Sequence, residues 1–262
     1  MFGLSFITEA WIETFLYILL RFAGMIIVSP IFGRKNLPAI FRIGLCAMLS
    51  IIVIMLLPPS SYTRTTNLFG FFTNAVMETV LGMLIGYLSL IGLSIAIAAG
   101  QIIDMQIGFG MANFFDKQLG MQIALTGSFL NIIVIMVFFM TNGHHKLIQL
   151  LFGSFQIMGP GKVIIGADLA QLLILYFTWF MVLVIQVAMP IIAVTITAEF
   201  ALGIIIKTMP QMNVFVVGIP LKIVLGLVVM MLFLPAFIML LQGAFDVMFE
   251  WHEKIILGLM AK

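Results

Sequence analysis

The sequence predicts an all-α membrane protein with about six long hydrophobic helices, some of them kinked. Of its 262 residues, 63% are hydrophobic and only 8% are charged, and the mean hydropathy is +1.27. A soluble domain has about 25% charged residues, so this chain has too few to cover a water-exposed surface. The apolar residues also form long segments, and a backbone in lipid satisfies its hydrogen bonds internally, which favours helices.

Six apolar segments follow one another along the chain, separated by stretches rich in helix-breaking or polar residues. We expect helices within Phe15–Phe32, Ile40–Leu57, Phe71–Gly100, Gln122–Met140, Leu169–Thr197 and Val214–Leu241. The breaks are Pro30–Asn36, Pro58–Ser61, Gly108–Gly120, Thr141–Asp168 and Lys207–Asn213.

The third, fifth and sixth segments are unusually long. Each has about 30 residues, or roughly 45 Å of helix, whereas about 20 residues cross a bilayer core. Pro190 and Pro235 lie within the fifth and sixth segments and should kink them. We therefore expect these helices to tilt steeply, to bend, or to lie largely inside a protein assembly.

The charge pattern argues against nucleic-acid binding and against a cleavable signal peptide. A net charge of +2 without a basic run gives no footprint for nucleic acid. The N-terminal stretch contains Glu9 and Glu13 but no Lys or Arg, which is not the pattern of a cleavable signal peptide. Cys46 is the only cysteine and is expected to be a buried apolar residue.

Ionisable residues inside apolar segments are costly and are candidates for function. They would serve either as a proton relay or as ion pairs, within the chain or with neighbouring subunits, and we favour pairing because they lie near segment ends. These residues are Arg21, Glu78, Asp104, Glu199, Lys207 and Lys222.

Small residues recur along the third segment, mostly at intervals of four. Such a stripe lets another helix approach closely, either within the chain or from another subunit. The residues are Gly82, Gly86, Gly92, Ala96 and Gly100.

The sequence contains no recognisable catalytic or metal-binding motif. His144 and His145 are adjacent, so on a helix they would point about 100° apart, and no carboxylate or thiol lies near them in sequence. We therefore expect them to anchor a loop or an interface, and we expect no metal or cofactor. Nucleotide-binding and nucleophile-elbow motifs are also missing.

The stretch Gly108–Gly120 differs from the other breaks because its glycines surround phenylalanines, with methionines nearby. Glycine permits a bent backbone, and Phe and Met offer bulky, deformable apolar surface. Such a loop could fill a lumen and be displaced, or it could be a re-entrant loop buried in protein. The residues concerned are Gly108, Phe109, Gly110, Met111, Phe114, Phe115 and Met121.

Taken together, these residues resemble the FliR/SctT family of type III secretion export-gate proteins, over nearly the whole chain. No single motif is specific, but their order and spacing are. The matching positions are Arg21, Gly24, Pro30, Gly33, Pro38, Arg42–Leu45, Gly108–Asp116, Thr141–His145, Ser154, Phe155, Pro190, Glu199, Gly203, Pro210–Phe215 and Gly218–Lys222.

The resemblance implies a subunit that assembles with FliP and FliQ, and further with FlhB and FlhA, in the flagellar basal body of a bacterial inner membrane. It implies a helical cone around an export channel for unfolded proteins, a FliP-like part over residues 1–168 and a FliQ-like hairpin over 169–262. The Gly108–Gly120 loop would plug the pore, and Pro210, Gln211 and Asn213 would belong to a family loop. Lys117 and Lys207 replace the family's usual proline and arginine.

Two other functions remain open at this point. An injectisome homologue would share all of these features, and gene neighbours or a motility phenotype would distinguish it. An ion-coupled secondary transporter would need two repeated halves with discontinuous helices, and the long third segment has no clear counterpart.

Overall fold

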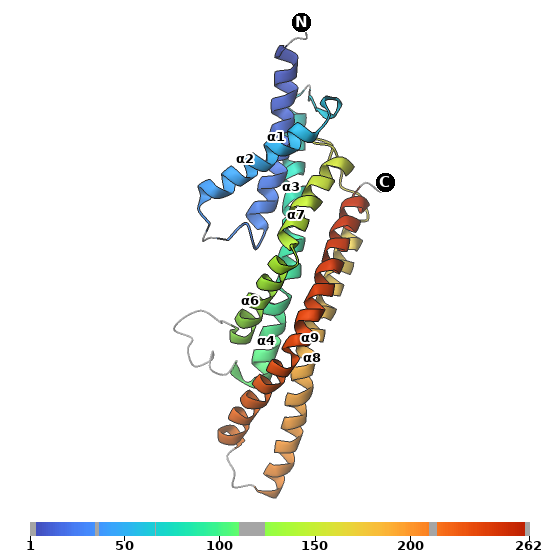
Figure 1. Cartoon of the computed structure of the whole chain (residues 1–262). Coiled ribbons are helices and arrows are strands. Elements are labelled where there is room, and N and C mark those ends of the chain that lie inside the picture. The colour runs from blue at the N-terminus through green and yellow to red at the C-terminus, as the bar shows by residue number, and fades with distance from the viewer. Residues whose placement is uncertain (1–3, 35–36, 66, 110–123, 210–213, 260–262) are drawn as a thin grey trace. The chain divides into compact units, whose positions relative to one another are not determined.

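The computed structural model describes residues 4–34, 37–65, 67–109, 124–209 and 214–259 (Figure 1). Their regular secondary structure is entirely helical, so the predicted all-α class is confirmed. The elements are α1 (Leu4–Val28), α2 (Ala39–Leu56), the 3-10 helix η1 (Pro59–Ser61), α3 (Leu68–Leu93), α4 (Ile95–Ile107), α6 (Leu125–Met140), α7 (Gly143–Ile157), α8 (Leu169–Thr208) and α9 (Val214–Gly258).

Five stretches of helix in the described residues are long and apolar enough to cross a membrane, and a sixth is obtained if α6 and α7 count as one broken span. This agrees with the prediction of about six long hydrophobic helices. The five are Glu9–Val28, Ala39–Leu56, Leu68–Ile107, Leu169–Thr208 and Val216–Gly258.

Prolines and glycines mark several of the helix ends, as the sequence predicts. Helix α1 ends at Val28, two residues before Pro30, and α2 ends at Leu56, two residues before Pro58. Helix α4 ends at Ile107, and its C-cap residue Gly108 has a φ of 98°, the left-handed conformation that glycine adopts most readily at a helix C-terminus.

The prediction that Thr141–Asp168 is a break was partly wrong, because α7 occupies much of it. Leu147, Leu151 and Phe155 recur at intervals of four residues and are buried. This spacing places them along one face of a helix. The polar residues around them suggested a loop, although they are compatible with the other face of an amphipathic helix.

Helices α8 and α9 are longer than predicted, with 40 and 45 residues. Beyond Leu241, charged residues such as Asp246 and Glu250 end the hydrophobic run but not the helix. Phe245, Met248 and Ile255 are buried there, so this part of α9 is amphipathic. Pro190 lies inside α8, and Pro220 and Pro235 lie inside α9, where each lacks the usual backbone N–H donor.

The chain divides into two compact units. Unit 1 comprises Met1–Gly92, His144–Tyr176 and Val247–Lys262, and unit 2 comprises Leu93–Gly143 and Phe177–Asp246. The sequence boundary at 168/169 coincides with the start of α8, but α8 and α9 each contribute to both units. The FliP-like and FliQ-like division therefore stays a prediction, and it differs from these units.

The core of unit 1 is formed by α1, α2, α3 and α7 together with the end of α9. Phe22 of α1 is fully buried, and its ring centroid lies 5.8 Å from that of Phe155 and 5.9 Å from that of Phe152. Cys46 is buried in the same core, as expected from the sequence.

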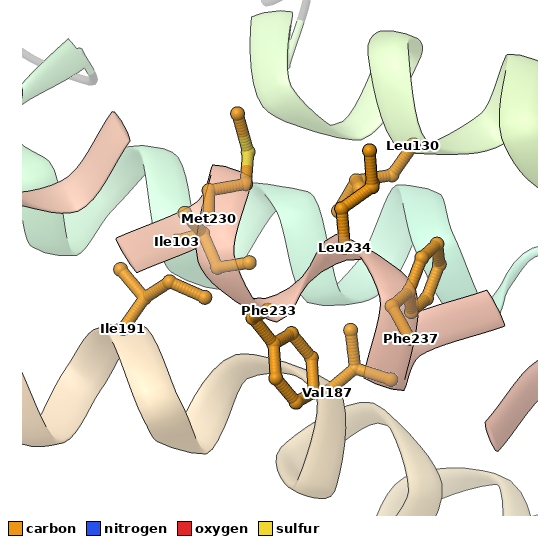
Figure 2. Close-up of a pocket in the computed structure, with 8 residues that line it drawn as sticks. All are labelled: Ile103, Leu130, Val187, Ile191, Met230, Phe233, Leu234 and Phe237. Carbon is orange, nitrogen blue, oxygen red and sulfur yellow. The ribbon is translucent and has the colours of Figure 1, made fainter. Parts of the chain in front are cut away.

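Unit 2 packs α4, α6 and its portions of α8 and α9 around apolar side chains (Figure 2). These side chains leave a void of about 10 Å³, at the lower limit for one water molecule. Its apolar lining indicates a small packing defect between helices rather than a ligand site. The lining residues are Ile103, Leu130, Val187, Ile191, Met230, Phe233, Leu234 and Phe237.

Candidate functional site

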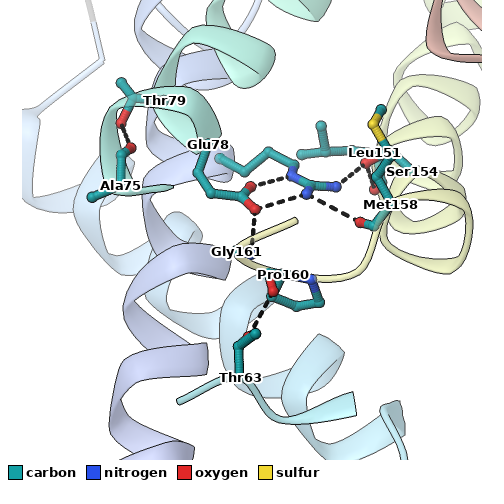
Figure 3. A network of polar contacts seen from close by, with 10 residues as sticks. Thr63, Ala75, Glu78, Thr79, Leu151, Ser154, Met158, Pro160 and Gly161 are labelled. Carbon is teal, nitrogen blue, oxygen red and sulfur yellow. Dashed lines mark hydrogen bonds and ion pairs between the residues drawn. The ribbon is translucent and has the colours of Figure 1, made fainter. Parts of the chain in front are cut away.

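An arginine and a glutamate form an ion pair in the interior of unit 1. Arg21 of α1 and Glu78 of α3 both have fully buried side chains. The guanidinium donates from Nε to Oε2 at 2.6 Å and from Nη2 to Oε1 at 3.0 Å (Figure 3). Two parallel bonds of this kind are the strong form of an arginine–carboxylate pair. Both residues were among those expected to pair, and in the structure they pair with each other.

The C-terminal turn of α7 completes the surroundings of this guanidinium. Nη1 of Arg21 donates to Ser154 Oγ at 2.9 Å, and Nη2 donates to the carbonyl of Met158 at 3.2 Å. The guanidinium carbon also lies 4.1 Å from the ring centroid of Phe155, within the range of a cation–π contact. Removing a charge from water is tolerable only with compensation of this kind.

The turn that follows α7 binds the other partner of the pair. The backbone N–H of Gly161 donates to Glu78 Oε1 at 2.7 Å, and Thr63 Oγ1 donates to the carbonyl of Pro160 at 2.6 Å (Figure 3). Gly161 has a φ of 74°, and a Cβ there would come within 2.8 Å of the Tyr17 ring. We call Arg21, Glu78, Ser154, Met158 and Gly161 the buried clasp. It joins α1, α3, α7 and the turn after α7.

A second polar group lies nearer the start of α1 and was missed from the sequence. Both oxygens of Glu13 accept the backbone N–H of Thr65, at 3.0 and 3.1 Å, and Oε1 also accepts the Tyr17 hydroxyl at 2.9 Å. In the sequence, Glu13 served only as an argument against a signal peptide. A carboxylate four residues before a tyrosine on one helix was the available signal.

Two small residues of the predicted stripe permit close packing of α1 against α3. A Cβ on Gly82 would come within 2.0 Å of the carbonyl oxygen of Arg21, and one on Gly86 within 2.7 Å of that of Met25. On the facing side, a Cβ on Gly24 would come within 2.4 Å of the carbonyl oxygen of Thr79. Only glycine fits at these three positions without a backbone shift.

The other members of the stripe also pack within the chain. In unit 1, a Cβ on Gly92 would meet the Met248 side chain at 2.4 Å. In unit 2, Ala96 is fully buried, and a Cβ on Gly100 would come within 2.1 Å of the Gly127 backbone. All five residues thus have neighbours in their own chain, which was one of the two predicted alternatives.

Three further ionisable residues lie towards one end of unit 2. Lys222 Nζ of α9 pairs with Glu199 Oε1 of α8, and the two side chains are 18% and 48% exposed. Lys207 is exposed in the last turn of α8 and forms no ion pair with another described residue. A cation at this position is favourable to the helix dipole. Pairing therefore holds for Glu199 and Lys222 in the structure, but not for Lys207 within the described chain.

Asp104 anchors the start of α6 instead of forming an ion pair. Both of its carboxylate oxygens accept the backbone N–H of Thr126, at 3.2 Å each. A carboxylate near a helix N-terminus satisfies an otherwise free donor and is favoured by the helix dipole. Asp104 lies near the end of α4, so this contact links the end of α4 to the start of α6.

The candidate plug lies mostly in that segment. Gly108 and Phe109 are described and are partly buried. Gly110, Met111, Phe114, Phe115 and Met121 lie outside the described residues, so their role stays a prediction.

The two histidines are helical rather than in a loop. His144 and His145 lie in the first turn of α7, with their ring centroids 4.1 Å apart. Here the loop prediction differs from the structure, because the α7 helix begins at Gly143, directly before them. Pro210, Gln211 and Asn213 lie outside the described residues.

A fully buried histidine near the C-terminus was missed from the sequence. His252 Nδ1 lies 2.7 Å from the carbonyl oxygen of Met248, and Nε2 lies 3.0 Å from Ser89 Oγ of α3. Beside it, the Tyr176 hydroxyl donates to the carbonyl of Leu88 at 2.7 Å. Polar groups that bond between helices specify their packing in apolar surroundings. The prediction ended the last apolar segment at Leu241, and His252 was therefore not considered.

These clusters have the chemistry of structural links between helices. The described residues include no group of three or more His, Cys, Asp or Glu side chains placed to hold a metal. The buried clasp contains a bonded arginine and glutamate but no nucleophile with an adjacent base. The geometry therefore defines a class: a helical membrane protein whose buried polar groups fasten its helices together.

Comparison with known proteins identifies the family within that class. Residues 12–248 match the family described as bacterial export proteins, family 1, and the chain belongs to this family. It is 30% identical over 247 residues to the flagellar biosynthetic protein FliR of Bacillus subtilis, covering 92% of this chain and 94% of that protein. The flagellar biosynthetic protein FliR of Escherichia coli K12 is 24% identical over 249 residues, covering 94% of each chain. That of Pectobacterium carotovorum is 28% identical over 255 residues, again covering 94% of each.

Proposed function

We propose that this chain is a structural gate subunit of the flagellar type III protein export apparatus. The observation that carries the proposal is the match to flagellar biosynthetic proteins FliR over more than nine tenths of both chains. A match of this extent covers the whole arrangement of helices rather than one motif. The proposed role is structural, and the chain would act by lining and closing a channel.

Exposed apolar helices support the role of a subunit. In the most apolar part of α9, only 11% of the residues are buried within the chain, and in α2 only 28%. Large side chains such as Met231 and Leu232 of α9 are more than 70% exposed. Surfaces of this kind require lipid or the helices of other proteins.

The proposed partners are FliP and FliQ, which would form a helical cone with one copy of this chain, and further FlhB and FlhA. The cone would stand in the bacterial inner membrane within the flagellar basal body and pass unfolded flagellar proteins. Glu199 and Lys207 of α8 are exposed and offer charged groups to such neighbours.

The first test is native mass spectrometry of the tagged chain after gentle extraction, with its neighbouring gene products co-expressed. We expect a large complex that holds one copy of this chain and several copies of two smaller membrane proteins. A monomer or homodimer despite co-expression would contradict the proposal and favour the transporter alternative. Uptake of substrate or protons by the purified chain in liposomes would then test that alternative.

We further propose that the segment around Phe109, Phe114 and Phe115 plugs the resting channel. Removing two aromatic side chains from a plug opens space for water and ions, so Phe114→Ala with Phe115→Ala should raise the ion leak of the assembled complex several-fold. The measurement is ion flux through the complex in liposomes. Phe69→Ala is the matched control, because Phe69 is 84% exposed in the first turn of α3. Unchanged leak in an assembled complex would exclude the plug role.

A further inference from the structure

We infer that α2 lies against the acyl chains of a phospholipid bilayer, and that Arg34 and Arg42 at its N-terminal end bind the anionic phosphates of lipid headgroups. The inference rests on the outward face of α2 and on the charges next to it. It is independent of the proposed export function.

From Ile43 to Leu56, the outward face of α2 is entirely apolar. The side chains that α2 buries are Cys46, Leu49, Ser50, Val53 and Ile54. The thiol of Cys46 and the hydroxyl of Ser50, in the middle of the helix, therefore both point inward. Ser50 Oγ donates to the carbonyl of Cys46 at 2.7 Å and needs no outside partner. The large exposed side chains are Ile40, Phe41, Ile43, Met48, Ile51, Ile52, Met55 and Leu56.

The length of α2 fits the hydrocarbon core of a bilayer. Its 18 residues span roughly 27 Å, and a bilayer core is about 30 Å thick. Polar groups flank this length at both ends. Arg34 and Arg42 lie at the N-terminal end, and the exposed Ser60 of η1 follows the C-terminal end.

The two arginines have no carboxylate partner among the residues that the structure describes. No acidic residue occurs in the sequence between Glu13 and Glu78, and the ion pairs among the described residues do not include Arg34 or Arg42. Arg34 Nε donates only to the carbonyl of Pro30, at 3.2 Å, and Arg42 Nε has no hydrogen-bond partner among the described residues.

Helix stability does not explain the position of Arg42. It is the fourth residue of α2, and a cation near a helix N-terminus is unfavourable to the helix dipole. Pro38, at the N-cap, makes no side-chain capping bond. An external anion at this end would balance both the arginine charges and the positive end of the dipole. A phosphate suits them, because a guanidinium binds phosphate through two parallel hydrogen bonds.

Lipid fits the outward face better than a second protein does. Protein interfaces contain about one hydrogen bond per 100–200 Å² and combine an apolar centre with a polar rim. Between Ile43 and Leu56, the exposed face of α2 has no side chain that can hydrogen-bond. Acyl chains require none, and the charges gather at one end of the helix, where headgroups would lie.

The lipid contact can be measured with a spin label, since the chain has only one cysteine. In a Cys46→Ser background, Met48→Cys is labelled in the full chain, co-expressed with its neighbouring gene products and reconstituted in phosphatidylcholine and phosphatidylglycerol. We expect frequent collisions with oxygen and few with a water-soluble nickel chelate. A label on the native Cys46 should be shielded from both reagents, and Ser60→Cys should be open to the nickel chelate. Shielding of position 48 from both reagents would show a protein partner and overturn the inference, and so would access by the nickel chelate.

The headgroup contact is tested with the same reconstituted protein. Native mass spectrometry counts retained phosphatidylglycerol for Arg34→Gln, Arg42→Gln and the double variant. We expect retention to fall about five-fold for each arginine, in line with the usual effect of a basic residue near an anionic surface. Arg42→Lys should keep most of the binding. Lys254→Gln is the control, because its exposed ammonium group lies on α9 and pairs with Glu250. Equal retention by the double variant and the control would overturn the headgroup site.

Discussion

At the scale of single residues, the buried clasp is the most demanding feature of this protein. Arg21 and Glu78 are 57 positions apart, and neither side chain reaches solvent. Removing two charges from water costs several kcal/mol per ion unless each finds a partner of good geometry. The clasp supplies that geometry from three helices and one turn, so its charges are compensated only when all four segments are in place.

The clasp predicts that a single substitution destabilises the protein more than a double substitution that removes both charges. Arg21→Ala leaves the Glu78 carboxylate buried without its cation, which should cost about 3–5 kcal/mol. Arg21→Met combined with Glu78→Met removes both charges and should recover a large part of that loss. The measurement is the thermal unfolding midpoint of the detergent-purified chain, together with the yield of monodisperse protein.

The control for the clasp is Glu9→Gln, which removes an exposed pair with Arg64 and should change stability by less than about 1 kcal/mol. If Arg21→Ala unfolds no earlier than Glu9→Gln, the clasp does not hold unit 1 together. A double variant as unstable as the single one would show that the hydrogen bonds of the clasp, rather than its charge balance, dominate.

At the scale of helices, α1 and α3 approach so closely that their backbones touch through glycines. Gly24 on α1 faces Thr79, and Gly82 on α3 faces Arg21. This crossing lies beside the clasp, so glycine packing and the ion pair act on the same two helices. Without such small residues, the Arg21 and Glu78 side chains would be held farther apart.

Gly82→Ala should therefore destabilise unit 1, although alanine is the better helix former. Its Cβ would lie 2.0 Å from the carbonyl oxygen of Arg21, which forces a backbone shift that costs about 1–3 kcal/mol. Gly153→Ala in α7 is the matched control, since nothing lies within 4 Å of its Cβ, and it should be neutral or slightly stabilising. Thermal unfolding of both variants is the measurement. Equal midpoints for Gly82→Ala and the parent chain would contradict this close packing.

At the scale of the whole molecule, the described residues carry far more exposed apolar surface than a soluble protein tolerates. Side chains such as Ile40, Phe69 and Met140 are at least 80% exposed, and they come from three different helices. The chain therefore needs lipid or partner helices over much of its length.

This surface predicts stable retention in membranes. After expression and washing of the membranes with sodium carbonate at high pH, which strips peripheral proteins, we expect nearly all of the chain in the pellet. Five to six apolar helices hold a chain far more firmly than surface attachment does. Complete release into the supernatant would show that the exposed apolar surface is covered by protein and not by lipid. The measurement is quantitative immunoblotting, with a known peripheral protein as the control.

The sequence by itself determined the class of fold, most helix locations and the family. Composition excludes a soluble protein, and a long apolar segment in lipid has few alternatives to a helix. Cys46 was also recognised correctly as a buried residue. The amphipathic helix α7 was missed, since its polar face was interpreted as a loop.

Only the tertiary structure decided which polar groups meet. Sequence spacing predicts partners three or four residues apart on one helix. It does not predict that Arg21 meets Glu78 and Ser154, or that His252 meets Ser89, because these pairs form where distant helices cross. The structure also decided that Gly82 and Gly86 face α1. It decided as well that Ser50, in the middle of α2, points inward. Local propensity determines that helices form, whereas the packing of one helix against another determines which faces and charges are left for lipid and for partners.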